Sequence, residues 1–467
     1  MTRRPPIATA ALAALLALAP AAAAPDFPPD NIQIHLEPRP ALHPALDRLA
    51  DTHLPALEAF YRDLHRHPEL SGEETRTAAA FADRLEALGY HVTRGVGGTG
   101  LVGWLRTGDG PIVLLRADMD ALPITEATGL PYASEVTVTR DGTPTGVMHA
   151  CGHDIHLASA LGAATLLAEL RDRWRGTVIV IAQPAEEIGA GARAMIRDGL
   201  FERFPIPDAI FALHTIEDMP AGRVALEPGW VFATVDSVDI TVHGKGGHGA
   251  RPHQTADPIV AAAAIVTALQ TLVSRRVEPG EPAVVTVGAF HAGTKHNVIP
   301  DEATLKLTVR SYSEATRRTL LDGIEAIARH TCAAHGCVKA PTVTVKDDPT
   351  PAAYNHPGLT AGATAVLTAL LGPDDVRPGA ASTGGEDFAR YSRATGRPAL
   401  MLRLGVSPPD AFAPDGTPKR ALPGLHSPRF APVPGPSIHT GARALAALAL
   451  AMLAPADATP AEKPSLR

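Results

Sequence analysis

The sequence predicts an α/β protein with a mostly parallel sheet flanked by helices, into which a ferredoxin-like α+β domain is inserted. Short apolar runs such as residues 178–182 alternate with helical stretches, which is typical of parallel sheets. Near residue 232 this pattern gives way to alternating apolar and polar residues, and it returns after residue 347. A chain of 467 residues, 45% of them hydrophobic, is long enough to bury the cores of two domains.

The first part of the chain begins with helices and continues with a buried strand. Residues 44–66 and 73–88 carry apolar side chains at helical spacing, and residues 111–115 form a short apolar run. A further helix is expected over residues 155–169. Strands that alternate with helices pair in parallel, and the carboxyl ends of parallel strands meet in one crevice. We therefore expect polar residues that follow these strands to lie close together.

Two later strands each lead into polar residues. Residues 178–182 are apolar, and the Gln-Pro pair that follows ends this strand just before Glu186 and Glu187. The apolar run over residues 208–213 ends at His214. Both sets of polar side chains should therefore reach the crevice at the carboxyl edge of the sheet.

The middle of the chain has the element order β-α-β-β-α-β of a ferredoxin-like domain. Asp257 is placed as the N-cap of a helix and Pro258 as its first residue, a pair that favours helix initiation. Besides that helix, we expect strands at residues 238–242, 283–289, 303–309 and 342–345 and a helix over residues 313–335.

The α/β pattern then returns. We expect a helix over residues 357–371, a strand over residues 399–404 and a terminal helix after Pro436. The chain therefore divides into a main α/β domain, residues 45–231 and 347–455, and an inserted domain, residues 232–346, called the insert below.

The first 24 residues resemble a signal peptide. Arg3 and Arg4 precede an Ala/Leu-rich apolar run over residues 7–18, and small residues at 21–24 offer cleavage sites. An uncleaved anchor is the alternative. No later run reaches about 18 uninterrupted apolar residues, so no membrane span is expected. We expect a secreted protein, periplasmic in a Gram-negative source, and the net charge of −7 without a basic stripe argues against nucleic acid as a partner.

Two of the three cysteines leave two interpretations open. Cys332 and Cys337 lie near the end of a predicted helix, and Gly336 can break the helix between them. In an oxidising compartment they could form a small disulfide. Two unpaired, half-buried thiols are the other interpretation.

Cys151-Gly152-His153 and the pair Glu186-Glu187 point to metal chemistry. A thiolate and an imidazole two residues apart can hold a soft divalent ion. Two adjacent carboxylates can then supply a ligand and a general base side by side. No Gly-x-Ser-x-Gly serine nucleophile motif is present in the sequence.

Seven motifs resemble a zinc-metallopeptidase family that includes hippurate hydrolases, auxin-conjugate amidohydrolases, aminoacylases and related carboxypeptidases. They stand in the family's order over nearly all of residues 55–450. The motifs are YRDLHRHPELSGEETRTA, LLRADMDALPI, GVMHACGHDIH, QPAEE, GKGGHGARPH, HNVIPD and GGEDF.

The resemblance implies a site for two divalent metal ions, with Cys151 bridging them. It implies that Glu186 is the general base and acid. It also implies that Asp120 orients a metal ligand without binding the ion itself. A thiolate ligand favours zinc, while manganese, cobalt or nickel would also be accepted. The implied ligands are Cys151, His153, Glu187, His214 and His426.

The resemblance also implies that the insert acts as a lid and mediates a homodimer. His248 and Asn297 would contact the substrate from the insert, with contact across the dimer interface as one option for His248. Glu386 and Asp387 are expected to support the site, and His65 and His67 to be structural. His156 is either near the site or a packing residue.

His426 is where the sequence departs from the family. The acidic residues that often follow this element are replaced by the run APVP at residues 431–434. The core Leu-His-Ser-Pro-Arg still matches, so His426 is preferred as a ligand over His439. The departure concerns the loop conformation more than ligation.

The sequence therefore predicts a secreted, metal-dependent amidohydrolase that cleaves an N-acyl amino acid or another small peptide-like amide. A metallo-carboxypeptidase that acts on short peptides is the nearest alternative, since the same site would serve both reactions. A non-catalytic, metal-dependent binding protein of the same fold is the third. The presence of Glu186 argues against that third function, because a binding site has no use for a base beside its ligands.

Overall fold

A computed structural model describes residues 34–140, 142–346 and 348–456. The predicted signal peptide, residues 1–24, lies outside these described residues. The larger part of the structure is an eight-stranded sheet. Its strands, in spatial order, are β1 (His91–Arg94), β2 (Leu101–Arg106), β7 (Thr177–Gln183), β3 (Ile112–Asp118), β8 (Ala209–Pro220), β19 (Ala399–Ser407), β9 (Val224–Leu226) and β18 (Val376–Pro378).

The four central strands are parallel. β7, β3, β8 and β19 pair in parallel, while β1, β2 and β9 add antiparallel partners nearer the edges. All seven residues of β7 are buried, as expected for a strand covered on both faces. The mostly parallel sheet that the sequence predicts is confirmed.

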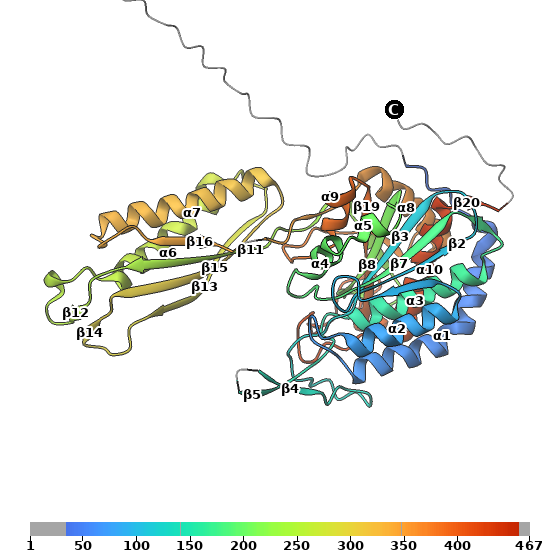
Figure 1. Cartoon of the computed structure of the whole chain (residues 1–467), viewed down its shortest axis with the longest axis horizontal. Coiled ribbons are helices and arrows are strands. Elements are labelled where there is room, and N and C mark those ends of the chain that lie inside the picture. Colours follow the sequence, from blue (N-terminus) through green and yellow to red (C-terminus); the bar gives the residue numbers. More distant parts are fainter. Residues whose placement is uncertain (1–33, 141, 347, 457–467) are drawn as a thin grey trace, which may run out of the picture.

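Helices cover both faces of the sheet (Figure 1). One face packs against α1 (His43–Arg66), α2 (Thr75–Ala87), α3 (His153–Glu169), α8 (Pro357–Leu371) and α10 (Pro434–Met452). The other face packs against α4 (Gly191–Arg197), α5 (Leu200–Arg203) and α9 (Ala389–Thr395). Adjacent residues within one strand therefore belong to different cores, for example Ile179 and Val180 of β7.

Several strands extend further than the sequence predicts, among them two next to the candidate site. β3 continues to Asp118, and β8 passes through His214 to Pro220. His214 is therefore inside a strand and does not end one. β8 extends because β19 lies beside it over this whole length.

A second, four-stranded sheet forms the insert. Its strands, in spatial order, are β13 (Ala283–Ala292), β15 (Glu302–Ser311), β11 (Asp236–His243) and β16 (Thr342–Val345). The helices α6 (Pro258–Arg276) and α7 (Glu314–Ala334) pack on this sheet around one apolar core. The β-α-β-β-α-β order predicted from the sequence is found here, and Asp257 caps α6 by accepting the backbone N–H of Ile259 at 2.9 Å.

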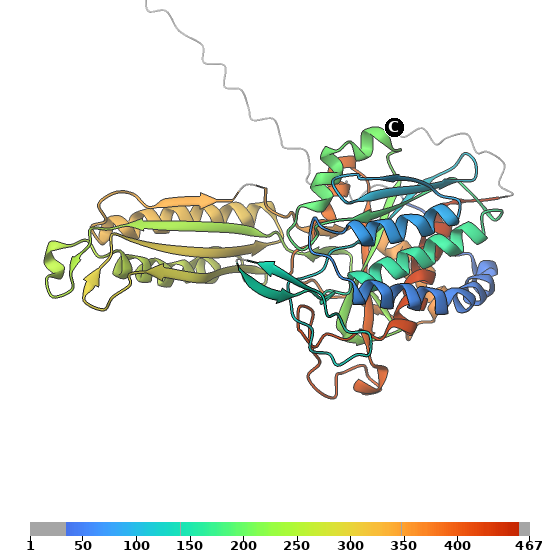
Figure 2. The same ribbon diagram turned by 60° about the horizontal axis from the view of Figure 1, so that its bottom comes forward.

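The insert projects away from the large sheet (Figures 1 and 2). It leaves and rejoins beside a two-stranded sheet of β10 (Gly229–Phe232) and β17 (Ala353–Asn355). β12 (Gly247–His248) and β14 (Val298–Ile299) pair at the end of the insert furthest from the large sheet (Figure 1). A small hairpin, β4 (Thr137–Arg140) and β5 (Thr143–Gly146), belongs to the main α/β domain.

Among the described residues, α6 is long and apolar enough to cross a membrane by length and composition. One third of its most apolar stretch is buried inside the protein. Its buried residues, such as Ile265 and Leu269, belong to the core of the insert. Packing within a domain is therefore sufficient to explain this apolar helix.

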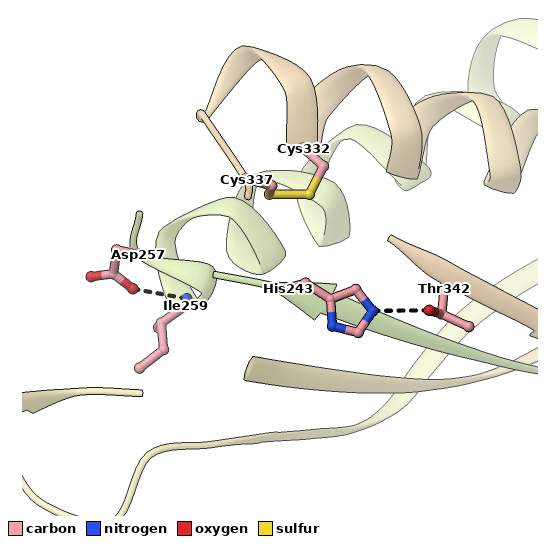
Figure 3. Close-up of a disulfide and its surroundings, with 6 residues drawn as sticks. All are labelled: His243, Asp257, Ile259, Cys332, Cys337 and Thr342. Carbon is pink, nitrogen blue, oxygen red and sulfur yellow. Dashed lines mark hydrogen bonds between the residues drawn. A yellow bond between two sulfur atoms is a disulfide. The ribbon is translucent and has the colours of Figure 1, made fainter. Parts of the chain in front are cut away.

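Cys332 and Cys337 form a disulfide at the end of α7 (Figure 3). The bond closes a short loop that contains Gly336, whose φ of 70° is the left-handed conformation that glycine favours. The chain then returns to the sheet, where the backbone N–H of Val338 donates to the carbonyl of His243. Of the two interpretations left open by the sequence, the disulfide is the one found.

Candidate metal centre

Side chains from four separate segments meet at the carboxyl edge of the central strands. Cys151 and His153 stand at the start of α3, and Glu187 follows β7. His214 comes from β8, and His426 comes from the loop before α10. The five predicted metal ligands are thus brought together by the parallel topology, as the strand ends predicted.

The donor atoms of these residues lie within a few ångströms of one another. Cys151 Sγ is 3.7 Å from His214 Nε2, and Glu187 Oε2 is 3.5 Å from His426 Nε2. His153 Nε2 is 3.9 Å from an oxygen of Glu186 and 3.9 Å from an oxygen of Glu187. Three overlapping groups have all their donor atoms within 4.8 Å of each other: Cys151, His153 and His214; Cys151, Glu187 and His426; His153, Glu186 and Glu187.

Gly152 allows Cys151 and His153 to stand on either side of a tight turn. Its φ is 80°, and an added Cβ would lie 2.7 Å from the hydroxyl oxygen of Thr215. Any side chain at this position would therefore be strained and would push the start of α3 away from β8. The glycine between the two ligands is required by this close approach.

Backbone carbonyls fix the orientation of the two buried imidazoles, those of His153 and His214. His153 Nδ1 lies 2.8 Å from the carbonyl oxygen of Asp120, and His214 Nδ1 lies 2.8 Å from that of Thr215. A carbonyl oxygen only accepts, so each Nδ1–H donates and each Nε2 faces the cluster. This is the arrangement in which neutral histidine presents its lone pair to a metal.

The residues fit a divalent metal site. The buried Nε2 of His153 and Oε1 of Glu187 have no hydrogen-bond partner among the described residues. Burial raises the pKa of the Cys151 thiol well above its usual range, and it is the main cause that raises the pKa of Glu187 to about 7. A bound cation is the ordinary way to keep such buried groups deprotonated. Sulfur, imidazole and carboxylate donors together suit zinc and other borderline metals.

Glu186 lies beside this donor set with its own carboxylate buried. Burial, followed by the nearby charges of Glu386 and Glu187, raises the pKa of Glu186 well above its usual range. The preceding residue, Ala185, has a φ of 51°, a left-handed conformation that is strained for a residue other than glycine. Such strain is common where a functional side chain must be presented in one direction.

Asp120 fixes the backbone of both glutamates. Its Oδ1 accepts the backbone N–H of Glu186 at 3.0 Å, and its Oδ2 accepts that of Glu187 at 2.9 Å. Oδ2 also accepts the hydroxyl of Ser71 at 2.6 Å. These contacts fit a residue that holds a ligand in place, and the orienting role of Asp120 that the resemblance implies stays a prediction.

A buried ion network lies under the site, and sequence reasoning identified only part of it. The Arg116 guanidinium donates to Asp118 at 2.6 Å and to Glu386 at 2.8 Å and 3.2 Å. Asp387 accepts from the Gln183 amide at 2.6 Å. Glu386 and Asp387 thus support the site, as expected. Arg116 was missed, although an arginine inside an apolar strand is itself a signal of a buried ion pair.

Other histidines take structural places near the site. His156 is buried, with Nδ1 2.6 Å from Asp118 and Nε2 accepting the backbone N–H of Thr215 at 2.9 Å. His156 of α3 therefore stabilises the backbone of β8 at Thr215. His65 is buried against Asp154 at 2.7 Å, as expected of a structural residue.

The loop that carries His426 closes over the site. His426 has a φ of 62°, and its backbone N–H donates to the carbonyl of Ala150 at 2.8 Å. Its side chain remains 53% exposed, so it is the outermost of the five predicted ligands. The rival, His439, is in α10 with its Nε2 3.2 Å from Asp51. The choice of His426 over His439 is therefore consistent with the geometry.

The structure does not bring His248 and Asn297 to this cluster within one chain. His248 belongs to β12, and Asn297 precedes its partner strand β14. Both residues are exposed, at the end of the insert that is furthest from the large sheet (Figures 1 and 2). Within a single chain, therefore, these two residues do not make the predicted contacts with a substrate bound at the cluster.

The cluster of predicted metal ligands opens into a cavity of about 850 Å³. Its lining includes Cys151, Glu186, Glu187, His214 and His426. The end of β8, the segment after β18 and Arg403 of β19 also line it. Such a volume accommodates a small organic ligand.

The chain is similar to known proteins over most of its length. Residues 114–451 match the model of peptidase family M20/M25/M40. Hippurate hydrolase of Campylobacter jejuni is 44% identical over 58% of this chain and 68% of its own length. Thermostable carboxypeptidase 1 of Saccharolobus solfataricus is 38% identical over 71% of this chain and 81% of its own length.

One similar solved structure is of a protein described as binding metal. It is a Bacillus subtilis protein described as a dinuclear metal-binding peptidase of the M20 family. The two structures superimpose with a TM-score of 0.68 at 32% identity, over 86% of this chain and 99% of the other.

Proposed function

This chain belongs to peptidase family M20/M25/M40, and we propose on that premise that it is a metal-dependent amidohydrolase that cleaves N-acyl amino acids. The observation that carries the proposal is the position of Glu186. This carboxylate lies beside the five gathered metal-ligand side chains and faces the same cavity. A protein that only binds metal has no use for a base at this point, which argues against the non-catalytic alternative.

The chemistry follows from the residues of the wall. Divalent cations held by the cluster would polarise the scissile carbonyl and lower the pKa of the attacking water from 15.7 towards about 7. Glu186 accepts the proton of that water and delivers it to the leaving amine. Positioned proton transfer of this kind contributes roughly 100- to 10,000-fold. Burial and the neighbouring carboxylates raise the pKa of Glu186, and a raised pKa favours the uptake of a proton by this carboxylate.

A carboxypeptidase that acts on short peptides is the second candidate. The relative from Saccharolobus solfataricus carries that name at 38% identity. Both reactions cleave a linear amide next to a free amino-acid carboxylate, so the same residues would serve both. The two functions differ only in the acyl group that the cavity accepts.

For the metal ions we propose zinc. A cysteine and imidazole nitrogens favour zinc over harder cations, and the carboxylate ligand would also accept manganese, cobalt or nickel. Two ions are proposed because the donor atoms form overlapping groups that share Cys151. Because Cys151 belongs to both groups, its thiolate would be the ligand that the two ions share.

We propose that the insert mediates a homodimer. β13 is an edge strand of its sheet, and an edge strand offers unpaired backbone groups to a second strand. Apolar side chains are exposed on the same domain: Ile259, Val260, Phe290 and Val298. A second copy docked here would cover them. It would also give His248 and Asn297 a route to the active site of the partner copy.

We propose that the protein is exported. The disulfide of the insert is an independent reason beside the apolar N-terminus, because disulfides persist in oxidising compartments and are rare in the reducing cytosol. In a Gram-negative source the destination would be the periplasm.

The test is hydrolysis of a panel of N-acyl amino acids and dipeptides by purified protein loaded with Zn²⁺, Mn²⁺ or Co²⁺. We expect metal-dependent release of the free amino acid from at least one N-acyl amino acid. Preference for dipeptides would favour the carboxypeptidase. Metal-dependent binding of these amides without turnover would contradict the proposed enzyme.

A further inference from the structure

Arg403 is a buried arginine that stands beside a predicted metal ligand. In the parallel pairing of β8 and β19, Arg403 is the register partner of His214, so the two side chains project from the same face of the sheet. The Arg403 guanidinium stacks on Phe232, with its carbon 3.9 Å from the ring centroid. The ring of His214 lies 5.4 Å from the same phenylalanine. Both polar groups therefore border one aromatic ring at the wall of the cavity.

This arginine lacks the partner that a buried guanidinium ordinarily has. It is 6% exposed, and its one hydrogen bond in the described residues runs from Nη2 to the carbonyl of Val231 at 3.2 Å. Its Nε is buried without a partner, and no carboxylate of the described residues forms an ion pair with it. Leaving such a charge unpaired costs several kcal/mol, so buried arginines are usually paired. Arg116, beneath the same site, shows the usual arrangement with Asp118 and Glu386.

The guanidinium stays charged at neutral pH. Burial lowers the pKa of Arg403 to about 10, while Glu386 and Glu227 raise it from a distance. Arg403 also lines the cavity together with Cys151 and His214. The cavity wall next to the proposed metal ions thus presents a fixed positive charge with free donor capacity.

The spacing suits the carboxylate of an N-acyl amino acid. In that molecule the carboxylate carbon lies three bonds from the scissile carbonyl carbon, roughly 3–4 Å away. Neighbouring strands are about 4.8 Å apart, so the carboxylate of a substrate whose carbonyl is bound near His214 can reach a donor on the adjacent strand β19. Arginine presents its donors in a fork that matches a carboxylate.

We propose that Arg403 receives the free carboxylate of the substrate and makes this enzyme selective for acyl amino acids over their carboxamides. The inference rests on the proposed function and adds its substrate class. Arg223, another arginine of the cavity, is paired with Asp375 at 3.2 Å and does not offer the same unpaired donor.

The kinetic test compares hippurate with its carboxamide, hippuramide, on the metal-loaded wild type, R403Q and R403K. Loss of a charged hydrogen bond predicts a KM for hippurate that rises roughly 10- to 100-fold in R403Q, with kcat and the KM for hippuramide nearly unchanged. R403K should recover part of the loss, and wild type should favour hippurate. R377Q is the competing variant, because Arg377 also lines the cavity and its buried Nε has no partner among the described residues. Loss of the preference in R377Q with the preference kept in R403Q would overturn the assignment. The control R106Q removes an exposed guanidinium that does not line the cavity and should leave this preference unchanged. Equal KM values for the two compounds in wild type, or equal losses for both in R403Q, would overturn the assignment.

A binding test separates this inference from the proposed function. Calorimetric titration of hippurate and hippuramide into metal-loaded Glu186→Gln should show tighter binding of hippurate, and the additional R403Q change should remove the difference. If wild type cleaves neither compound but this difference in binding is found, the proposed hydrolysis is contradicted and the role of Arg403 is supported. Binding of neither compound, or equal binding of both, would contradict the role of Arg403. Metal content and urea unfolding of R403Q should match wild type, and R403K provides the comparison that keeps the charge.

Discussion

The carboxylate of Asp120 accepts the backbone N–H of Glu187 at 2.9 Å with one oxygen and that of Glu186 at 3.0 Å with the other. One side chain from the segment after β3 therefore sets the direction of both carboxylates that follow β7. The proposed ligand and the proposed base are coupled through this single group.

Asp120→Asn should weaken the site without unfolding the protein. An asparagine side chain has one oxygen and cannot accept both backbone N–H groups, so Glu186 and Glu187 lose their fixed orientation. We expect metal affinity to fall about 10- to 100-fold, with a matching loss of kcat/KM at limiting metal. Competition with a fluorescent chelator measures the affinity. Asp109→Asn, an exposed aspartate beside Arg106, is the control and should behave as wild type.

Glu186→Gln and Glu187→Gln should separate the two glutamates. Glu186→Gln removes the proton carrier and keeps the ligands, so kcat should fall roughly 100- to 10,000-fold at normal metal content. Glu187→Gln removes a ligand and should lower metal content. Elemental analysis of both purified variants measures the difference. Metal loss in Glu186→Gln with normal content in Glu187→Gln would mean that the two roles are exchanged.

We expect the contribution of His65 to the free energy of unfolding to fall between about pH 6.5 and 9. Burial opposes its charge, but hydrogen bonds to Asp154 and Glu126 outweigh this and raise the pKa of His65 to about 9. The folded state then binds a proton that the unfolded state releases near its usual pKa of 6.5. The stabilisation is therefore complete below about pH 6.5 and is lost as the pH rises through 9.

Urea unfolding of wild type and His65→Gln across this pH range checks the His65 prediction. The difference in free energy of unfolding should shrink as the pH rises. His67→Gln, an exposed neighbour in sequence, is the control and should follow wild type. A constant difference from pH 6 to 10 would show that His65 is neutral in the folded protein.

Replacing residues 236–346 by a short glycine-serine linker should leave a folded, monomeric and inactive core. The ends to be joined are adjacent, since the backbone N–H of Val235 donates to the carbonyl of Thr350 at 2.9 Å. Inactivity is expected because His248 and Asn297 are lost. Light scattering, circular dichroism and the hydrolysis assay measure the three properties. A cut at residue 232 is the comparison and should be less stable, because Phe232 packs against His214. A dimer of the linker variant would contradict the role given to the insert.

The apolar pattern predicts most of the fold because burial and periodicity are linked. The strand before Glu186 and the helix that begins after Asp257 are both found close to their predicted bounds. The length of β8 was underestimated because polar residues from His214 onward resemble a strand end. They are buried or bordered by β19, a partner almost 190 residues later that local sequence does not reveal.

The sequence predicts the gathered ligands better than the groups around them. Cys151 and His153 lie in a motif at the start of a helix, Glu187 lies in a motif after a strand, and the topology brings the three together. Arg116 and Arg403 lie inside apolar strands. In the sequence, each appears only as a charged residue that interrupts a run of apolar residues. Their importance depends on which side chains lie opposite them, and this is set by strand register. The predicted contacts of His248 and Asn297 depend on a second copy, so a single chain leaves them as predictions.

X-ray diffraction from crystals of the zinc-loaded protein, recorded at the zinc absorption edge, tests the central claim most directly. We predict two anomalous peaks among the side chains of Cys151, His153, Glu187, His214 and His426, each at bonding distances of about 2.0–2.3 Å from its ligands. Absence of both peaks from this cluster, with the five side chains turned away from one another, would contradict the account.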